Sequence, residues 1–158
     1  MKASRVRAER GELVRMVEGS PHVEIVEQSD GHLLLRFTVP GTVIAGGQVT
    51  VRPEHHIRVV WPPVEIPGLV AFYEPQEDGG VWFHPNALAS EPYACCTNLE
   101  TQIARQAMTP MWMAVELIYR MLAGSWSAHD GVLNVAAAQW YAAAAARNQL
   151  PFTDEPFI

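Results

Sequence analysis

The residues best suited to chemistry in this chain form a tripeptide and, shortly after it, a pair of thiols. The tripeptide is His84-Pro85-Asn86, and the thiols are Cys95 and Cys96, the two cysteines of the sequence. A cysteine thiolate is a nucleophile, and a side-chain amide can donate a hydrogen bond to developing negative charge. The proline restricts the backbone between the histidine and the asparagine. The spacing therefore indicates reactive thiols that follow a rigid turn.

We expect both thiols to be free, because a disulfide between adjacent cysteines is strained. Free thiols are typical of a reducing cytosol, and the chain is expected to be cytoplasmic. A metal site is not expected, since adjacent cysteines cannot easily bind one zinc ion and no second pair lies at ligand spacing. Free cysteine is also commonly buried and inert, so two core thiols remain the alternative interpretation.

The composition is that of a globular protein, with 49% hydrophobic and 18% charged residues among 158. We expect one domain over residues 1–150, followed by a tail at 151–158.

No apolar run approaches the roughly 18 residues that span a bilayer, and the first residues are charged, so neither a membrane segment nor a signal is expected. A net charge of −6 without a basic run predicts no nucleic-acid partner. Without a glycine-rich phosphate loop, no nucleotide cofactor is expected.

The first half of the chain predicts one helix and then an antiparallel meander. Ser4 is a suitable N-cap for a helix that runs to about Val17, and Gly19 would end it. Alternating apolar residues on both sides of Asp30-Gly31 predict a hairpin, which Pro40-Gly41 would break. The predicted strands are Val23–Ile25, Leu33–Val39, Ile57–Trp61 and Leu69–Tyr73.

After the cysteines the apolar period changes from two to 3.6, which predicts helices. Thr109-Pro110 would begin one helix and Gly124 would end it. A last helix is expected from Asn134 to Ala146. The tail at 151–158 carries two phenylalanines and either docks on the domain or stays free. The predicted fold class is therefore α+β.

This order of elements resembles the ubiquitin-conjugating, or E2, family, whose fold is called UBC-like. Trp61-Pro62-Pro63 stands where the family has a Tyr-Pro-Phe-x-Pro-Pro stretch, and Leu69–Phe72 stands where it has its fourth strand. Phe83-His84-Pro85-Asn86 matches the family's His-Pro-Asn tripeptide. The segment Ala94–Thr97 departs from the usual Ile-Cys-Leu around the nucleophile. The resemblance covers nearly the whole chain and implies a divergent, bacterial E2-like protein of an antiviral (antiphage) defence operon.

The resemblance implies that one cysteine accepts a ubiquitin-like modifier from an E1-like activating enzyme as a thioester. The modifier would then pass to an amine of a target protein. In the family the nucleophile is exposed while its neighbours point inward. With Cys95 exposed, the inward residues are Ala94 and Cys96, both small and apolar, whereas exposure of Cys96 would bury the hydroxyl of Thr97. We therefore expect Cys95 to be the nucleophile, with Cys96 as the alternative.

Three further residues receive roles from the same resemblance. Asn86 either stabilises the oxyanion formed when the amine attacks or braces the active-site loop. His84 is expected to form hydrogen bonds within the turn, with a role as catalytic base as the alternative. Asp130 lies about where the family keeps an acidic residue near the incoming amine.

Two other interpretations predict different behaviour. A catalytically silent E2 variant would bind a ubiquitin-like protein as a scaffold, although such variants usually lack the cysteine. An unrelated small α+β protein with a chance tripeptide would have two inaccessible thiols.

Overall fold

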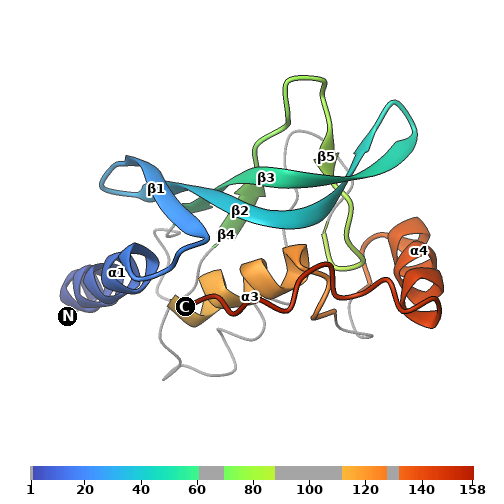
Figure 1. The fold of residues 1–158 in the computed structure, drawn as a ribbon. Helices are drawn as coiled ribbons and strands as arrows, with labels where there is room; N and C mark the ends of the chain where they lie inside the picture. The colour runs from blue at the N-terminus through green and yellow to red at the C-terminus, as the bar shows by residue number, and fades with distance from the viewer. Residues whose placement is uncertain (1, 61–69, 88–111, 128–131) are drawn as a thin grey trace.

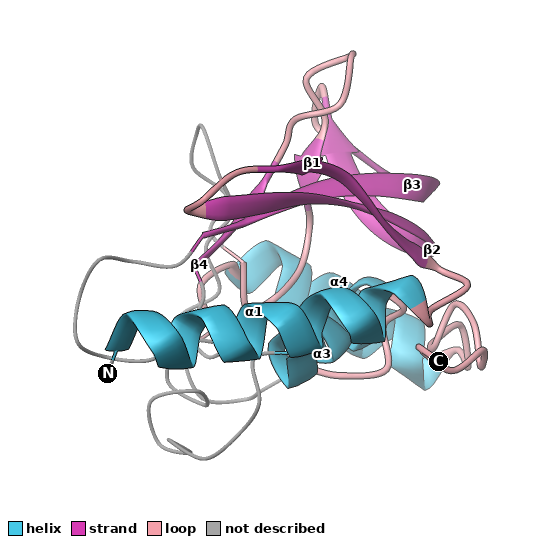
Figure 2. Cartoon of the chain, turned by 90° about the vertical axis from the view of Figure 1, so that its left-hand side faces the viewer, coloured by secondary structure: helices cyan, strands magenta, loops and turns pink. Residues whose placement is uncertain are grey.

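The computed structural model describes residues 2–60, 70–87, 112–127 and 132–158. Within these ranges an antiparallel sheet lies over helices, and Figure 1 shows α3 crossing beneath the centre of the sheet. Figure 2 shows the described helices on one side of the sheet. The predicted N-terminal helix, four-stranded meander and C-terminal helices are confirmed. No helix of the described part is long and apolar enough to cross a membrane.

The sheet follows the chain in the order β1-β2-β3-β4, and a fifth short strand, β5, pairs with β2. The alternation of apolar and polar residues along the strands decides which face of the sheet is buried. Leu33, Leu35 and Phe37 on β2 are fully buried, and Leu35 pairs with Ile57 of β3. Side chains of successive residues point to opposite faces of a sheet, so the residues between them face away from the helices. The strands are β1 (Val23–Gln28), β2 (His32–Ala45), β3 (Gln48–Val60), β4 (Val70–Tyr73) and β5 (Val81–Trp82).

The expected break at Pro40-Gly41 is wrong. Strand β2 continues through both residues to Ala45, and the register shifts between Thr38 and Gly41. A bulge of this kind tolerates a proline, which cannot donate to the ladder. Strand β3 consequently begins at Gln48, nine residues before the predicted start at Ile57. The turn between the strands uses Gly46 and Gly47 at φ angles of 56° and 77°, as a two-residue hairpin requires.

The helices are α1 (Lys2–Glu18), α3 (Trp112–Leu122) and α4 (Val135–Ala146). Helix α3 buries Val115, Ile118 and Leu122 against the sheet, and their spacing of three and four residues is the helical period that the sequence predicted for this region. The predicted helix start at Thr109-Pro110 lies outside the described residues. The predicted start of α4 is confirmed, because the side chain of Asn134 accepts the N–H of Ala137 at 3.0 Å.

The tail docks on the domain. It runs from α4 back along α3 toward α1, and its Phe157 is 4% exposed within the main core (Figure 1). The hydroxyl of Tyr119 donates to the carbonyl of Glu155 at 2.7 Å, and the hydroxyl of Ser20 donates to the carbonyl of Phe157. Of the two alternatives that the sequence left open for the tail, the structure shows docking, with the second phenylalanine in the protein's own core.

Candidate functional site

The His84-Pro85-Asn86 tripeptide forms a tight turn just after β5. The N–H of Phe83 donates to the carbonyl of Thr42 at 3.1 Å, which extends the pairing of β5 with β2 by one residue. The N–H of Ala87 then donates to the carbonyl of His84 at 3.1 Å, which closes the turn. Proline is favoured at the second position of such a turn because its φ angle is already suitable.

His84 is fully buried, and both of its ring nitrogens are engaged. Its Nδ1 accepts the N–H of Asn86 at 3.0 Å, so this nitrogen carries no proton. The proton is therefore on Nε2, which lies 3.1 Å from the carbonyl of Trp126 and donates to it. The histidine thus forms hydrogen bonds within the turn and also ties the turn to the segment after α3.

Burial keeps this imidazole neutral. It lowers the pKa of His84 to about 4 from the usual 6.5, and the hydrogen bond to the Trp126 carbonyl opposes this shift only in part. The ring packs against aromatic neighbours, with its centroid 5.7 Å from that of Trp82 and 5.2 Å from that of Tyr141. A neutral imidazole with both nitrogens hydrogen-bonded is a structural group at pH 7.

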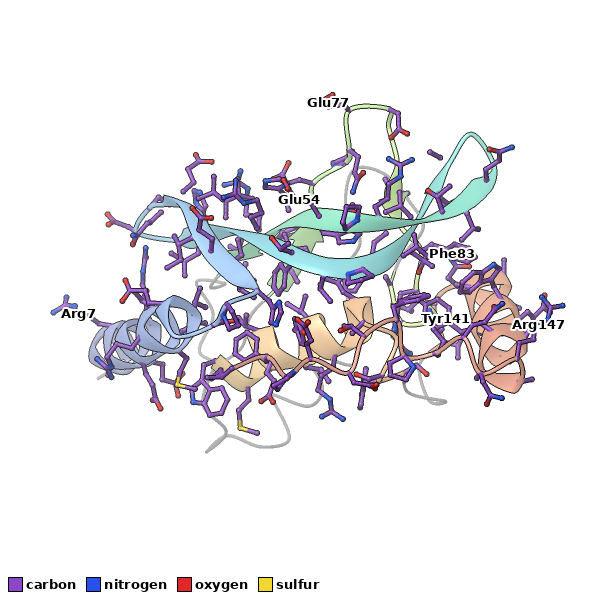
Figure 3. The ribbon with its side chains drawn as sticks, viewed as in Figure 1. Arg7, Glu54, Glu77, Phe83, Tyr141 and Arg147 are labelled. Atoms are coloured by element: carbon purple, nitrogen blue, oxygen red, sulfur yellow. The ribbon has the colours of Figure 1, made fainter. Side chains whose placement is uncertain are left out.

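Helix α4 begins on the turn. The carbonyl of Pro85 accepts the N–H groups of Leu133 and Asn134 at 2.8 and 3.2 Å. Asn134 is the N-cap of the helix, so the backbone of the turn and the first residues of α4 are joined directly. About two helical turns after Asn134, the ring of Tyr141 packs against the ring of His84 in a T-shaped contact, with an angle of 69° between the ring planes. The labelled side chains Phe83 and Tyr141 lie side by side between the sheet and α4 in Figure 3, and both belong to one small apolar cluster.

Asn86 is fully buried in the same turn. A hollow of about 570 Å³ borders the turn on the side of α4, with Pro85, Trp126 and Tyr141 among the residues that line it. The lining combines apolar side chains with a few polar groups, such as the hydroxyls of Ser125 and Ser127.

The structure brings together only part of the predicted site. His84 and Asn86 lie in one turn, whereas Cys95, Cys96 and Asp130 lie outside the described residues. Among the described residues no group of three or more histidine, cysteine, aspartate or glutamate side chains could hold a metal ion. The adjacent pair His55 and His56 takes opposite sides of β3, with the former buried and the latter partly exposed.

Three residues that the sequence did not point to hold the turn from elsewhere in the chain. Trp126, Tyr141 and Thr42 contribute a carbonyl, a ring edge and a hydroxyl from three separate elements. The one available signal was Tyr141, a polar aromatic residue within an alanine-rich helix that has no charged side chain. Comparison of the chain with protein-family models, with curated proteins and with solved structures gives no match.

Proposed function

We propose that this protein is an E2-like conjugating enzyme with a UBC-like fold. In this proposal Cys95 accepts a ubiquitin-like modifier from an E1-like enzyme and delivers it to an amine of a target protein. The observation that carries the proposal is the buried His84-Pro85-Asn86 turn, which α4 and the sheet hold rigidly nine residues before Cys95. In the proposal, this turn supplies a fixed side-chain amide for the chemistry of the thiol that follows it in the sequence.

The arrangement of elements supports the same proposal. An N-terminal helix, a four-stranded meander, the tripeptide and two later helices follow one another in the order that the resemblance implies. The tripeptide lies where the sheet meets α4, and Pro85 joins it to the helix start. Both His84 and Asn86 are fully buried, so the turn belongs to the packed fold and not to an exposed loop.

The proposed reaction has two acyl transfers. First, the thiolate of Cys95 attacks the thioester carbonyl carbon of the charged E1, and the E1 thiolate leaves as the new thioester forms. Second, a neutral amine of the target attacks the carbonyl carbon of this thioester and the C–S bond breaks, so that an amide forms, the Cys95 thiolate leaves and the nitrogen loses one proton to the solvent. Each tetrahedral intermediate carries an oxyanion, and a donor directed at it is worth roughly 3 kcal/mol.

The described residues limit the roles within this scheme. His84 uses Nδ1 to accept from Asn86 and Nε2 to donate to Trp126, so neither nitrogen is available to take a proton from the amine. We therefore assign His84 to the positioning of the turn. Asn86 supplies the amide that stabilises the oxyanion or braces the loop, and Asp130 is the proposed carboxylate near the incoming amine.

The test is E1-dependent charging. The protein is mixed with ATP and with the E1-like and ubiquitin-like proteins of the operon that the resemblance implies, and products are separated on a non-reducing gel. Wild type should give an adduct that added thiol removes. Cys95→Ala should abolish it while Cys96→Ala should keep it, and the reverse pattern would make Cys96 the nucleophile. Absence of an adduct in wild type, with the E1 itself shown to be charged, would reject the enzyme.

A second measurement separates the remaining interpretations. The rate of thiol alkylation in the folded protein, read by mass spectrometry, should show one cysteine that reacts nearly as fast as a free thiol of the same pKa. If neither thiol reacts until the protein unfolds, the cysteines are core residues. A protein with a reactive thiol that binds the modifier but never charges would be the silent scaffold.

A further inference from the structure

Thr42 holds the residue before the tripeptide by two hydrogen bonds. Its hydroxyl donates to the carbonyl of Phe83 at 2.6 Å, and its own carbonyl accepts the N–H of Phe83 at 3.1 Å. Both residues are buried, so water does not compete for these groups. The backbone of Phe83 is therefore fixed on both sides immediately before His84.

Tyr141 completes this arrangement from α4. Its hydroxyl forms a hydrogen bond with the hydroxyl of Thr42. The single hydroxyl proton of Thr42 goes to the carbonyl of Phe83, so Tyr141 must donate to Thr42. Burial raises the pKa of Tyr141, which keeps this donor protonated. The chain of donation runs from Tyr141 to Thr42 and on to the Phe83 carbonyl, across 99 residues of sequence between the two hydroxyls.

We infer that Tyr141 and Thr42 are positioning residues of the proposed transfer site: together they set the orientation of the turn that carries Asn86. The inference rests on the proposed conjugating activity. The hydroxyl pair fixes the carbonyl of Phe83, while the ring of Tyr141 contacts His84 at a centroid distance of 5.2 Å. Two consecutive residues at the entry of the turn are thus constrained by one side chain of α4.

The expected consequence is slower transfer to the amine. Tyr141→Phe keeps the ring against His84 and removes only the donor, so the turn gains freedom without losing its packing. Discharge of the loaded protein to free lysine should slow about tenfold, less than the roughly 100-fold cost of losing a direct oxyanion donor. Loading should change less, because groups of the E1 also act in that step. Thr42→Val should give the same split between discharge and loading.

Matched variants separate positioning from a general loss of stability. Tyr73→Phe removes another buried phenol, which bonds to His55 at 2.6 Å, and should discharge at the wild-type rate. Thr42→Ser keeps the hydroxyl and should restore most of the discharge rate that Thr42→Val loses. The double variant Tyr141→Phe/Thr42→Val should be no slower than the slower single variant, since both changes break one chain of hydrogen bonds.

Hydrogen exchange at the Asn86 amide tests the inference without any partner protein. This N–H is bonded to Nδ1 of His84, and it should exchange faster in Tyr141→Phe than in wild type or Tyr73→Phe. Unchanged exchange, or discharge and loading reduced by the same factor, would overturn the inference even if conjugation occurs. Faster exchange in a protein that never charges would reject the proposed function while the positioning of the turn stands.

Discussion

Nδ1 of His84 accepts the backbone N–H of Asn86 across 3.0 Å, so the first residue of the tripeptide orients the third. This hydrogen bond exists only while Nδ1 is unprotonated. Protonation of Nδ1 in acid therefore removes it. Burial also lowers the pKa of His55 to about 4, so His55 is protonated in the same acid range. Both buried imidazoles consequently make the fold sensitive to pH.

We expect the free energy of unfolding to fall as the pH is lowered from about 6.5 toward 4. In the unfolded chain each histidine is protonated near its usual pKa of 6.5, whereas in the folded chain each stays neutral until the pH falls to about 4. The unfolded state therefore binds more protons between these two pH values. Each histidine should cost about 3 kcal/mol by pH 4. Urea denaturation at several pH values measures the slope. His84→Gln should make the slope shallower, and an unchanged slope would contradict the role of His84.

Gly41 should tolerate no side chain. A Cβ added there would lie 2.9 Å from Nε2 of His55, and 3.1 and 3.2 Å from the Cδ2 and carbonyl oxygen of Leu122. Overpacking of this kind typically costs roughly 1–3 kcal/mol, and we expect that loss for Gly41→Ala in thermal or urea unfolding. Gly31→Ala is the matched control, because nothing lies within 4 Å of its added Cβ. Equal stability of the two variants would show that the bulge in β2 relaxes freely.

The N-cap of α4 should contribute to both helix and site. Asn134→Ala removes the acceptor for the N–H of Ala137 and should lower the free energy of unfolding by about 1 kcal/mol. Asn134→Asp keeps an acceptor and should stay close to wild type. Since the N–H of Asn134 bonds to the Pro85 carbonyl, amide exchange in the turn should also rise in the alanine variant. Stability equal to wild type in Asn134→Ala would mean that the cap is replaced by water.

Docking of the tail should be visible in stability. Phe157→Ala empties a site in the main core and should cost about 3 kcal/mol or more, the usual range for a buried phenylalanine. Ile158→Ala, in which the side chain is 54% exposed, should cost little. Urea unfolding of the two variants gives the comparison. A loss below about 1 kcal/mol for Phe157→Ala would show that the tail adds little to the fold.

Patterns over a few neighbouring residues predicted the helices and strands whose formation depends mainly on those residues. The alternation of Leu33, Leu35 and Phe37 predicted a half-buried strand, and the cap at Asn134 predicted the start of α4. Strand β5 was missed because its two residues are too few to show a period. Strand β2 was cut short because a proline usually ends a strand, whereas here a bulge accommodates Pro40.

The surroundings of the site could not be predicted in the same way. The tripeptide indicated a turn, and the turn is present, but the groups that hold it come from distant parts of the chain. Thr42 is one residue in a long strand, and Trp126 contributes only a carbonyl, which any residue carries. Their importance arises from tertiary packing, which brings β2, α4 and the segment after α3 to one place.

The hydrogen bond from Ser20 to the Phe157 carbonyl joins residues 137 positions apart. Tyr119 of α3 packs on the same phenylalanine, and His22 pairs with Glu155 at 3.2 Å, so the segment after α1 and the tail share one set of contacts. Neither segment can open without uncovering the other. Thermal fluctuations should therefore release the segment after α1 and the tail together, so a change at residue 157 should also alter amide exchange near Ser20 and His22.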